Sequence, residues 1–153
     1  MKSRIRAALT IAAMVLLCAS IAGAQAKPDF SGAWKMNPQN SKFGGGSHPD
    51  AVRIKIDHNE PALTEDCSMS TPAGELAFRA KYTTDGKEAE QYVMGRIAKA
   101  SAKWEGASLI IEFKAENGFF FKRVVTLSAD GKTMTEVVTR SGVADDIAVF
   151  EKQ

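Results

Sequence analysis

Cysteine is scarce in this chain. Of two cysteines in 153 residues, Cys18 lies in an apolar N-terminal run that we expect to be removed, which leaves Cys67 alone. A single cysteine excludes an intrachain disulfide, even in an oxidising compartment. We expect Cys67 to be a buried, inert thiol; a reactive or dimer-forming thiol is the alternative.

Motifs for phosphate and hydrolytic chemistry are also missing. Gly131-Lys132-Thr133 is not a phosphate loop, because that motif requires glycine five residues before the Gly-Lys pair, where this chain has Thr126. Gly44-Gly45-Gly46 follows no predicted strand and opens no helix, which argues against a dinucleotide loop. Neither G-x-S-x-G nor H-E-x-x-H occurs. We therefore predict no cofactor.

Metal ligands and catalytic acids are equally sparse. A zinc or copper site drawn through His48, His58 and Cys67 matches no known ligand spacing, so we expect no metal. Glu90 and Glu136 are the carboxylates that strand alternation allows to face inward, as acid–base catalysis would require. A rim position or a solvated face is the competing interpretation for both. We predict a protein that is not an enzyme.

The N-terminus has the pattern of a secretory signal peptide. Lys2, Arg4 and Arg6 precede an apolar segment, residues 7–21, that is short for a membrane span. Small-x-small sites then favour cleavage after Ala24, with Ala26 as the alternative. A lipid anchor at Cys18 is rejected, because the preceding residue is Leu17. We predict a signal peptide over 1–24 and one domain over 25–153, exported to the periplasm or secreted, without a transmembrane segment.

Removal of the signal changes the charge balance. Three of the 20 basic residues leave with it, so 17 remain against 18 acidic residues and the net charge is near −1. Charges of both signs are interspersed, so no basic stripe indicates nucleic-acid binding.

The remaining sequence alternates between apolar and polar residues with the period of β-strands. Asn117-Gly118 and two Asp-Gly-Lys sequences, 85–87 and 130–132, are typical hairpin turns. Together these patterns predict about ten strands, near 29–35, 51–58, 62–70, 75–83, 88–95, 97–104, 107–115, 118–128, 133–141 and 144–152. A sheet of this size with little helix must hide its edges. We predict an all-β, single antiparallel up-and-down barrel of about 8–10 strands; a sandwich is the alternative.

One long irregular stretch, residues 37–50, interrupts this pattern. All five prolines lie between positions 28 and 72, and Pro38 and Pro49 bracket the stretch. We expect a short helical turn near 39–43 and then a flexible flap containing the three glycines, because long loops in compact domains often form lids or mouths.

The segment Phe30-Ser31-Gly32-Ala33-Trp34-Lys35 resembles the glycine-x-tryptophan signature of lipocalins and related calycin barrels. Its continuation over 35–44 is similar to small exported bacterial proteins described as lipocalin-like. Further similar segments, over 82–87, 127–135 and 150–152, are generic hairpins. Lipocalins carry a late arginine that packs over the signature tryptophan, a position for which Arg140 is the candidate. The lipocalin C-terminal helix is absent, which favours a ten-strand relative, as in fatty-acid-binding proteins.

The resemblance implies that the barrel binds a small hydrophobic molecule, and it does not imply an enzyme. An envelope protein-interaction module, or a protease-inhibitor-like barrel that uses the 37–50 segment, is the alternative. Strand alternation places these side chains toward the barrel interior, which makes them the candidate ligand-binding residues: Phe78, Tyr82, Tyr92, Trp104, Phe113 and Arg123. Arg123 is the most informative, since a buried arginine needs an anionic partner, either a ligand carboxylate or an internal acid.

Gly32 and Trp34 are predicted to be structural. The indole is expected to plug the closed end of the barrel, with its N–H on a backbone carbonyl. The glycine is expected to allow close packing there.

Overall fold

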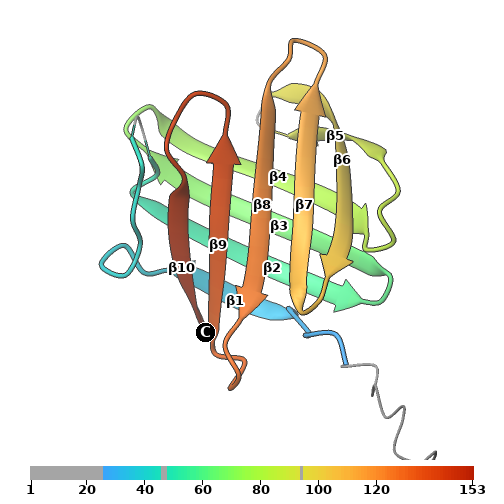
Figure 1. Ribbon diagram of the computed structural model, residues 1–153. Coiled ribbons are helices and arrows are strands. Elements are labelled where there is room, and N and C mark those ends of the chain that lie inside the picture. Colours follow the sequence, from blue (N-terminus) through green and yellow to red (C-terminus); the bar gives the residue numbers. More distant parts are fainter. Residues whose placement is uncertain (1–25, 46–47, 94) are drawn as a thin grey trace, which may run out of the picture.

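The computed structural model describes residues 26–45, 48–93 and 95–153, and these residues form ten β-strands and no helix (Figure 1). The expected signal peptide lies outside them. Accordingly, no helix in the described part of the chain is long and apolar enough to span a membrane. The strands are β1 (Gly32–Met36), β2 (Ala51–Asn59), β3 (Ala62–Thr71), β4 (Gly74–Thr83), β5 (Ala89–Val93), β6 (Arg96–Glu105), β7 (Ser108–Ala115), β8 (Phe120–Leu127), β9 (Thr133–Arg140) and β10 (Asp146–Lys152).

The strands form a single antiparallel sheet in the order β4-β3-β2-β1-β10-β9-β8-β7-β6-β5. Strand β1 connects strands β2–β4 with strands β5–β10, because it pairs with both β2 and β10. In Figure 1, β7–β10 stand in front and β2–β4 run across behind them. The predicted all-β, up-and-down barrel is confirmed, and the sandwich is not formed.

Strand alternation gives the barrel its interior. Apolar positions on β2, β6 and β7 that were predicted to face inward are buried, as in Ile54, Ala102 and Ile111. Strand β5 is an exception, because Val93 is buried while Tyr92 is 70% exposed. The prediction that Tyr92 faces inward is wrong. Because Tyr92 and Val93 are adjacent and both apolar, the alternation pattern allows either of them to face inward. This short edge strand pairs only with β6 among the described strands, so few neighbours fix which side faces the interior.

The barrel has a seam between its edge strands, β4 and β5. No backbone pairing between these strands occurs within the described residues. Instead, the side chain of Gln91 spans the seam. Its amide oxygen accepts a hydrogen bond from the Lys81 backbone N–H (3.1 Å), and its amide nitrogen donates to the Lys81 carbonyl (2.6 Å). One side-chain amide thus takes the place of a peptide group at this point of the sheet.

The irregular segment between β1 and β2 is attached to β10. Lys42 and Ile147 exchange two backbone hydrogen bonds of 2.7 Å, and the Gly44 N–H donates to Asp146 Oδ1 at 2.9 Å. A Cβ on Gly44 would lie only 2.4 Å from the Ala144 carbonyl oxygen, so this glycine permits close packing. The expected helical turn is absent, since the described residues form a turn at 38–40 and a bridge at Lys42. Lys42 and Gly44 are therefore attached to the sheet, whereas residues 46 and 47 of the expected flap lie outside the described residues.

Candidate functional site: a half-filled barrel with a buried charged cluster

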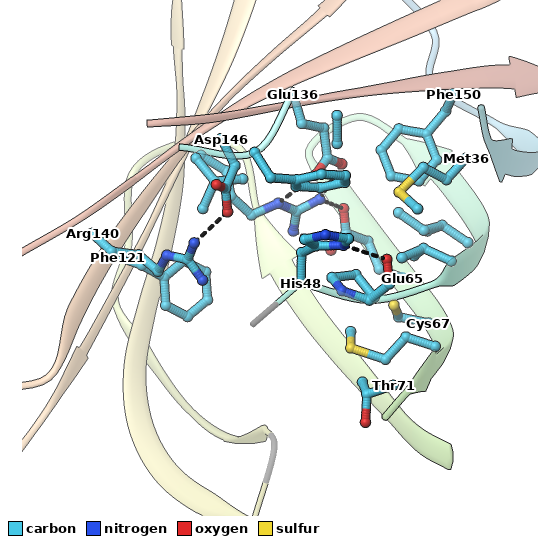
Figure 2. A pocket seen from close by; sticks show the side chains of 18 of the residues that line it. Met36, His48, Glu65, Cys67, Thr71, Phe121, Glu136, Arg140, Asp146 and Phe150 are labelled. Carbon is cyan, nitrogen blue, oxygen red and sulfur yellow. Dashed lines mark hydrogen bonds and ion pairs between the residues drawn. The ribbon is translucent and has the colours of Figure 1, made fainter. Parts of the chain in front are cut away.

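A group of three charged side chains lies inside the barrel: Glu65, Arg123 and Glu136, called here the charged cluster. All three residues are at least nine-tenths buried. The Arg123 guanidinium donates to Glu65 from Nη1 (2.7 Å) and Nη2 (3.0 Å). It also donates to Glu136 from Nη2 (2.5 Å) and Nε (3.2 Å). Both carboxylates therefore make the two-contact pairing that is strongest for arginine (Figure 2).

The sheet brings these residues together from distant parts of the chain. Glu65 is central in β3, whereas Arg123 and Glu136 are diagonal neighbours on β8 and β9, where Arg123 pairs in register with Val138 and Val125 with Glu136. Tyr82, diagonal to Glu65 across β3 and β4, donates its hydroxyl to Glu65 at 3.3 Å. The cluster thus ties together opposite walls of the barrel.

Burial and mutual charge shift the pKa values of this group. Burial raises the pKa of the Glu136 carboxyl, and the opposing charge of Arg123 does not fully offset it. For Arg123, burial would lower the pKa, but the charges of Glu136 and Glu65 outweigh it and hold the guanidinium protonated. Burial, followed by the Glu65 charge, raises the pKa of Tyr82 well above its ordinary value, so the phenol stays neutral and donates.

A cavity of about 280 Å³ lies on one side of the cluster. This volume lies just below the range of roughly 300–1,000 Å³ that is usual for small-molecule sites. Its walls are mostly apolar, and Glu65, Arg123 and Glu136 form its charged floor. Apolar or aromatic lining residues include Met36, Val52, Ile54, Met69, Phe78, Phe113, Phe121, Val138, Ala148 and Phe150.

The mouth of the cavity is formed by the β1–β2 segment and by β9 and β10. Phe43 and His48 stack with ring centroids 4.2 Å apart, and both line the cavity. Arg140 forms an ion pair with Asp146 at the same rim (Figure 2). The predicted packing of Arg140 over Trp34 is therefore wrong. Instead, Lys152 lies over the indole, with Nζ 5.3 Å from the ring centroid.

The opposite end of the barrel is filled. Trp34 is 1% exposed, and its indole N–H donates to the Phe30 carbonyl at 2.9 Å. Gly32 has a φ of +133°, and a Cβ there would lie 2.7 Å from Lys152 Cε. Because a lysine side chain can move, the backbone conformation is the stronger reason for glycine at this position.

A hydrogen-bonded group covers this filled end. Glu60 accepts from the Trp104 indole N–H (2.8 Å) and the Thr84 hydroxyl (2.6 Å), and pairs with His58 Nε2 (2.9 Å). Burial would raise the pKa of Glu60, but the hydrogen bonds from Thr84, His58 and Trp104 together lower it. Trp104 also stacks on Phe30, with centroids 5.9 Å apart.

The six residues suggested as ligand contacts are thus divided. Phe78, Phe113 and Arg123 line the cavity, Tyr82 supports the charged cluster, and Trp104 lies at the filled end. Tyr92 is outside. Glu65 was missed, although alternation with Leu63 and Cys67 would have placed it inward. Whether the lining residues bind a ligand stays a prediction.

The catalytic and metal alternatives are not favoured by these positions. Glu90 is exposed, which removes it as an inward acid, and Glu136 is held by Arg123. Within the described residues, no group of three or more His, Cys, Asp or Glu side chains is placed to hold a metal. Cys67 lines the cavity as a free thiol, and burial raises its pKa to about 12, so the reactive thiolate is suppressed at neutral pH.

Comparison with known proteins supports the fold. No protein-family model and no curated protein matches the sequence. Among solved structures, the wild-type fluorescent protein UnaG is similar, with a TM-score of 0.63 and 14% identity over 81% of this chain and 97% of that one. The REP1-NXSQ fatty acid transporter has a TM-score of 0.61 and 14% identity, over 82% of this chain and 96% of that one. Fatty-acid-binding protein 1 of Echinococcus granulosus has a TM-score of 0.59 and 12% identity, over 80% of this chain and 96% of that one. The chain thus has the same ten-strand, antiparallel up-and-down β-barrel fold as these structures.

Proposed function

We propose that the protein binds a small apolar molecule inside its barrel. The observation that carries this proposal is the apolar cavity of about 280 Å³ with a few convergent polar groups on its floor, the usual form of a small-molecule site. Two similar structures are, by name, a fatty acid transporter and a fatty-acid-binding protein, which agrees with a binding role on this fold.

Filling the cavity tests the proposal. Ala148 lines the cavity from β10, so Ala148→Phe should occupy the ligand's space and lower the affinity for an apolar fluorescent probe by at least about tenfold. Ala77→Phe, on the exposed face of β4, adds the same ring outside and should leave affinity unchanged. Native mass spectrometry of the purified protein should also show a bound small molecule. A folded Ala148→Phe protein with unchanged affinity would place the probe elsewhere and overturn the proposal.

We also propose that the protein acts after export, in the periplasm or outside the cell. The signal-like pattern of residues 1–24 supports this proposal. N-terminal sequencing of the protein recovered from fractionated cells should find Gln25, or Lys27 for the alternative site. A chain recovered from the cytoplasm with Met1 intact would contradict export.

A further inference from the structure

The cavity contains more carboxylates than guanidiniums, which bears on the class of ligand; this inference rests on the proposed binding function. The titratable side chains that line it, apart from the Cys67 thiol, are His48, Glu65, Arg123, Glu136, Arg140 and Asp146. Two guanidinium groups, those of Arg123 and Arg140, thus face three carboxyl groups, those of Glu65, Glu136 and Asp146. The excess lies at the floor, because Arg140 and Asp146 neutralise each other at the mouth.

Arg123 is already engaged by two carboxylates. Four of its five N–H groups donate to Glu65 and Glu136, which leaves one N–H of Nη1. An anionic head group placed here would lie beside two carboxylates in a poorly solvated interior, where repulsion between like charges is much stronger than in water. The floor therefore disfavours the head group of a fatty acid.

The same floor favours a donor or a cation. Glu65 and Glu136 share the single guanidinium of Arg123, so the cluster has one carboxylate more than it has guanidiniums. Aromatic rings of Phe113 and Phe121 stand next to the cluster, stacked with centroids 4.3 Å apart, and ring faces attract cations as well. An organic ammonium group would complete the charge balance and keep its hydrocarbon body against the apolar walls.

We propose that the cavity selects a small apolar cation, an organic ammonium compound, whose head group lies against Glu65 and Glu136 and whose hydrocarbon body lies against Phe78, Phe113 and Phe121. At the mouth, Arg140 Nε is buried without a hydrogen-bond partner, and this donor suits an uncharged acceptor on the ligand. The similar structures named for fatty acids share a barrel fold with this chain, and the ligand class proposed here follows from this chain's own floor, where two carboxylates flank one guanidinium.

Three ligands with one tail and different heads test this selection: octylammonium, octanol and octanoate. Titration calorimetry at neutral pH should show octylammonium binding at least about tenfold more tightly than octanoate, with octanol between them, a difference of about 1.4 kcal/mol or more. Octanoate binding as tightly as octylammonium would overturn the ligand class while leaving the binding function intact. If none of the three binds, and the apolar probe does not bind either, the binding function itself fails.

A charge-removing variant identifies the residues responsible. Glu136→Gln keeps the shape of the side chain and removes the excess charge, so the preference for octylammonium over octanoate should shrink about tenfold while octanol affinity stays the same. Glu90→Gln removes a charge from the outer surface and is the matched control. Equal weakening of all three ligands would mean a merely structural role and would overturn the assignment. If circular dichroism shows that Glu136→Gln is unfolded, Glu65→Gln replaces it as the charge-removing variant. The order of the three ligand affinities in the wild-type protein tests the proposal in either case.

Discussion

The two halves of the barrel are built on the same strands and have different interiors. Inward positions of β3 run from Leu63 through Glu65 to Cys67, and those of β9 run from Met134 through Glu136 to Val138. On each strand, the first residue is part of the filled half, the second belongs to the charged cluster and the third lines the cavity. The cluster is therefore the boundary between a packed core and a hollow site.

This division separates stability from binding. Leu63, Leu109 and Met134 in the filled half are at most 2% exposed and do not line the cavity, so close packing there supplies the hydrophobic stabilisation. A buried ionic group is weak evidence for stability, because desolvation offsets its internal attraction. The charged cluster is thus better explained by the cavity that it faces than by the core behind it.

Two glutamates show the same contrast electrostatically. Glu60, at the filled end, has its pKa lowered by donated hydrogen bonds, although burial acts against them. Glu136, at the floor of the cavity, has its pKa raised chiefly by burial. A buried carboxyl group with a shifted pKa beside a cavity is typical of a functional site.

The largest effect is expected from Trp34→Ala in the filled half. Loss of this buried indole should lower the free energy of unfolding by about 3–5 kcal/mol, while the affinity of the remaining folded protein for an apolar probe should change little. Chemical denaturation and probe titration measure the two quantities. Trp104→Ala, at a less buried indole, should cost less. A Trp34→Ala protein of normal stability that no longer binds the probe would place the tryptophan in the site.

The reverse pattern is expected from Phe78→Ala in the hollow half. Phe78 is only half-buried and lines the cavity, so its truncation should cost roughly 1–2 kcal/mol of stability and lower probe affinity about tenfold. Leu76→Ala, two residues earlier on β4 and exposed, is the control and should change neither strongly. Unchanged affinity in Phe78→Ala would mean that the hollow half is not the binding site.

Sequence patterns predicted the barrel well because its information is local. Alternation and Asp-Gly or Asn-Gly turns act over a few residues, and all ten strands occur close to their predicted ranges. Gly118, for example, has a φ of +80°, and its N–H closes the turn after β7 by donating to the Ala115 carbonyl at 3.0 Å. Tyr92 was misplaced where local information failed, beside Val93 on an edge strand.

The site was less predictable because it depends on contacts across the sheet. Glu65 and Arg123 are separated by 58 positions, and no local sequence pattern predicts which inward-facing carboxylate pairs with which inward-facing arginine. The cation over Trp34 was misassigned for a similar reason. Pairing of β1 with β10 brings Lys152, not Arg140, opposite Trp34. Inward parity found Arg123, but its partners required the fold.

A third, smaller effect should appear as opposite dependences of stability on pH. Because the folded pKa of Glu136 is raised, the folded state holds its proton longer, and this residue's contribution should fall as pH rises above the ordinary value of 4.5. Because the folded pKa of Glu60 is lowered, its contribution should be complete above 4.5 and be lost as pH falls through the folded pKa.

Denaturation midpoints of Glu136→Gln and Glu60→Gln, each measured across this pH range against wild type, test these signs. The charged groups near Glu136 are Arg123 and Glu65, so Glu65→Gln is a needed third curve. Relative to wild type, Glu136→Gln should gain stability as pH rises and Glu60→Gln should lose it. Two curves that shift in the same direction would contradict the contrast between the two environments.

The smallest effect is expected at the seam between β4 and β5. Gln91→Ala removes both hydrogen bonds to the Lys81 backbone, but the site is partly exposed and water can replace them, so the loss of stability should be below about 1 kcal/mol. The amide of Lys81 should nevertheless exchange with solvent faster, since the side chain of Gln91 is its partner across the seam. Hydrogen exchange followed residue by residue measures this, with Lys99→Ala on the outer face of β6 as a control.

If Gln91→Ala accelerates exchange at Lys81 but leaves ligand affinity intact, the seam and the cavity are independent. Lower affinity together with faster exchange would show that closing the seam also shapes the hollow half.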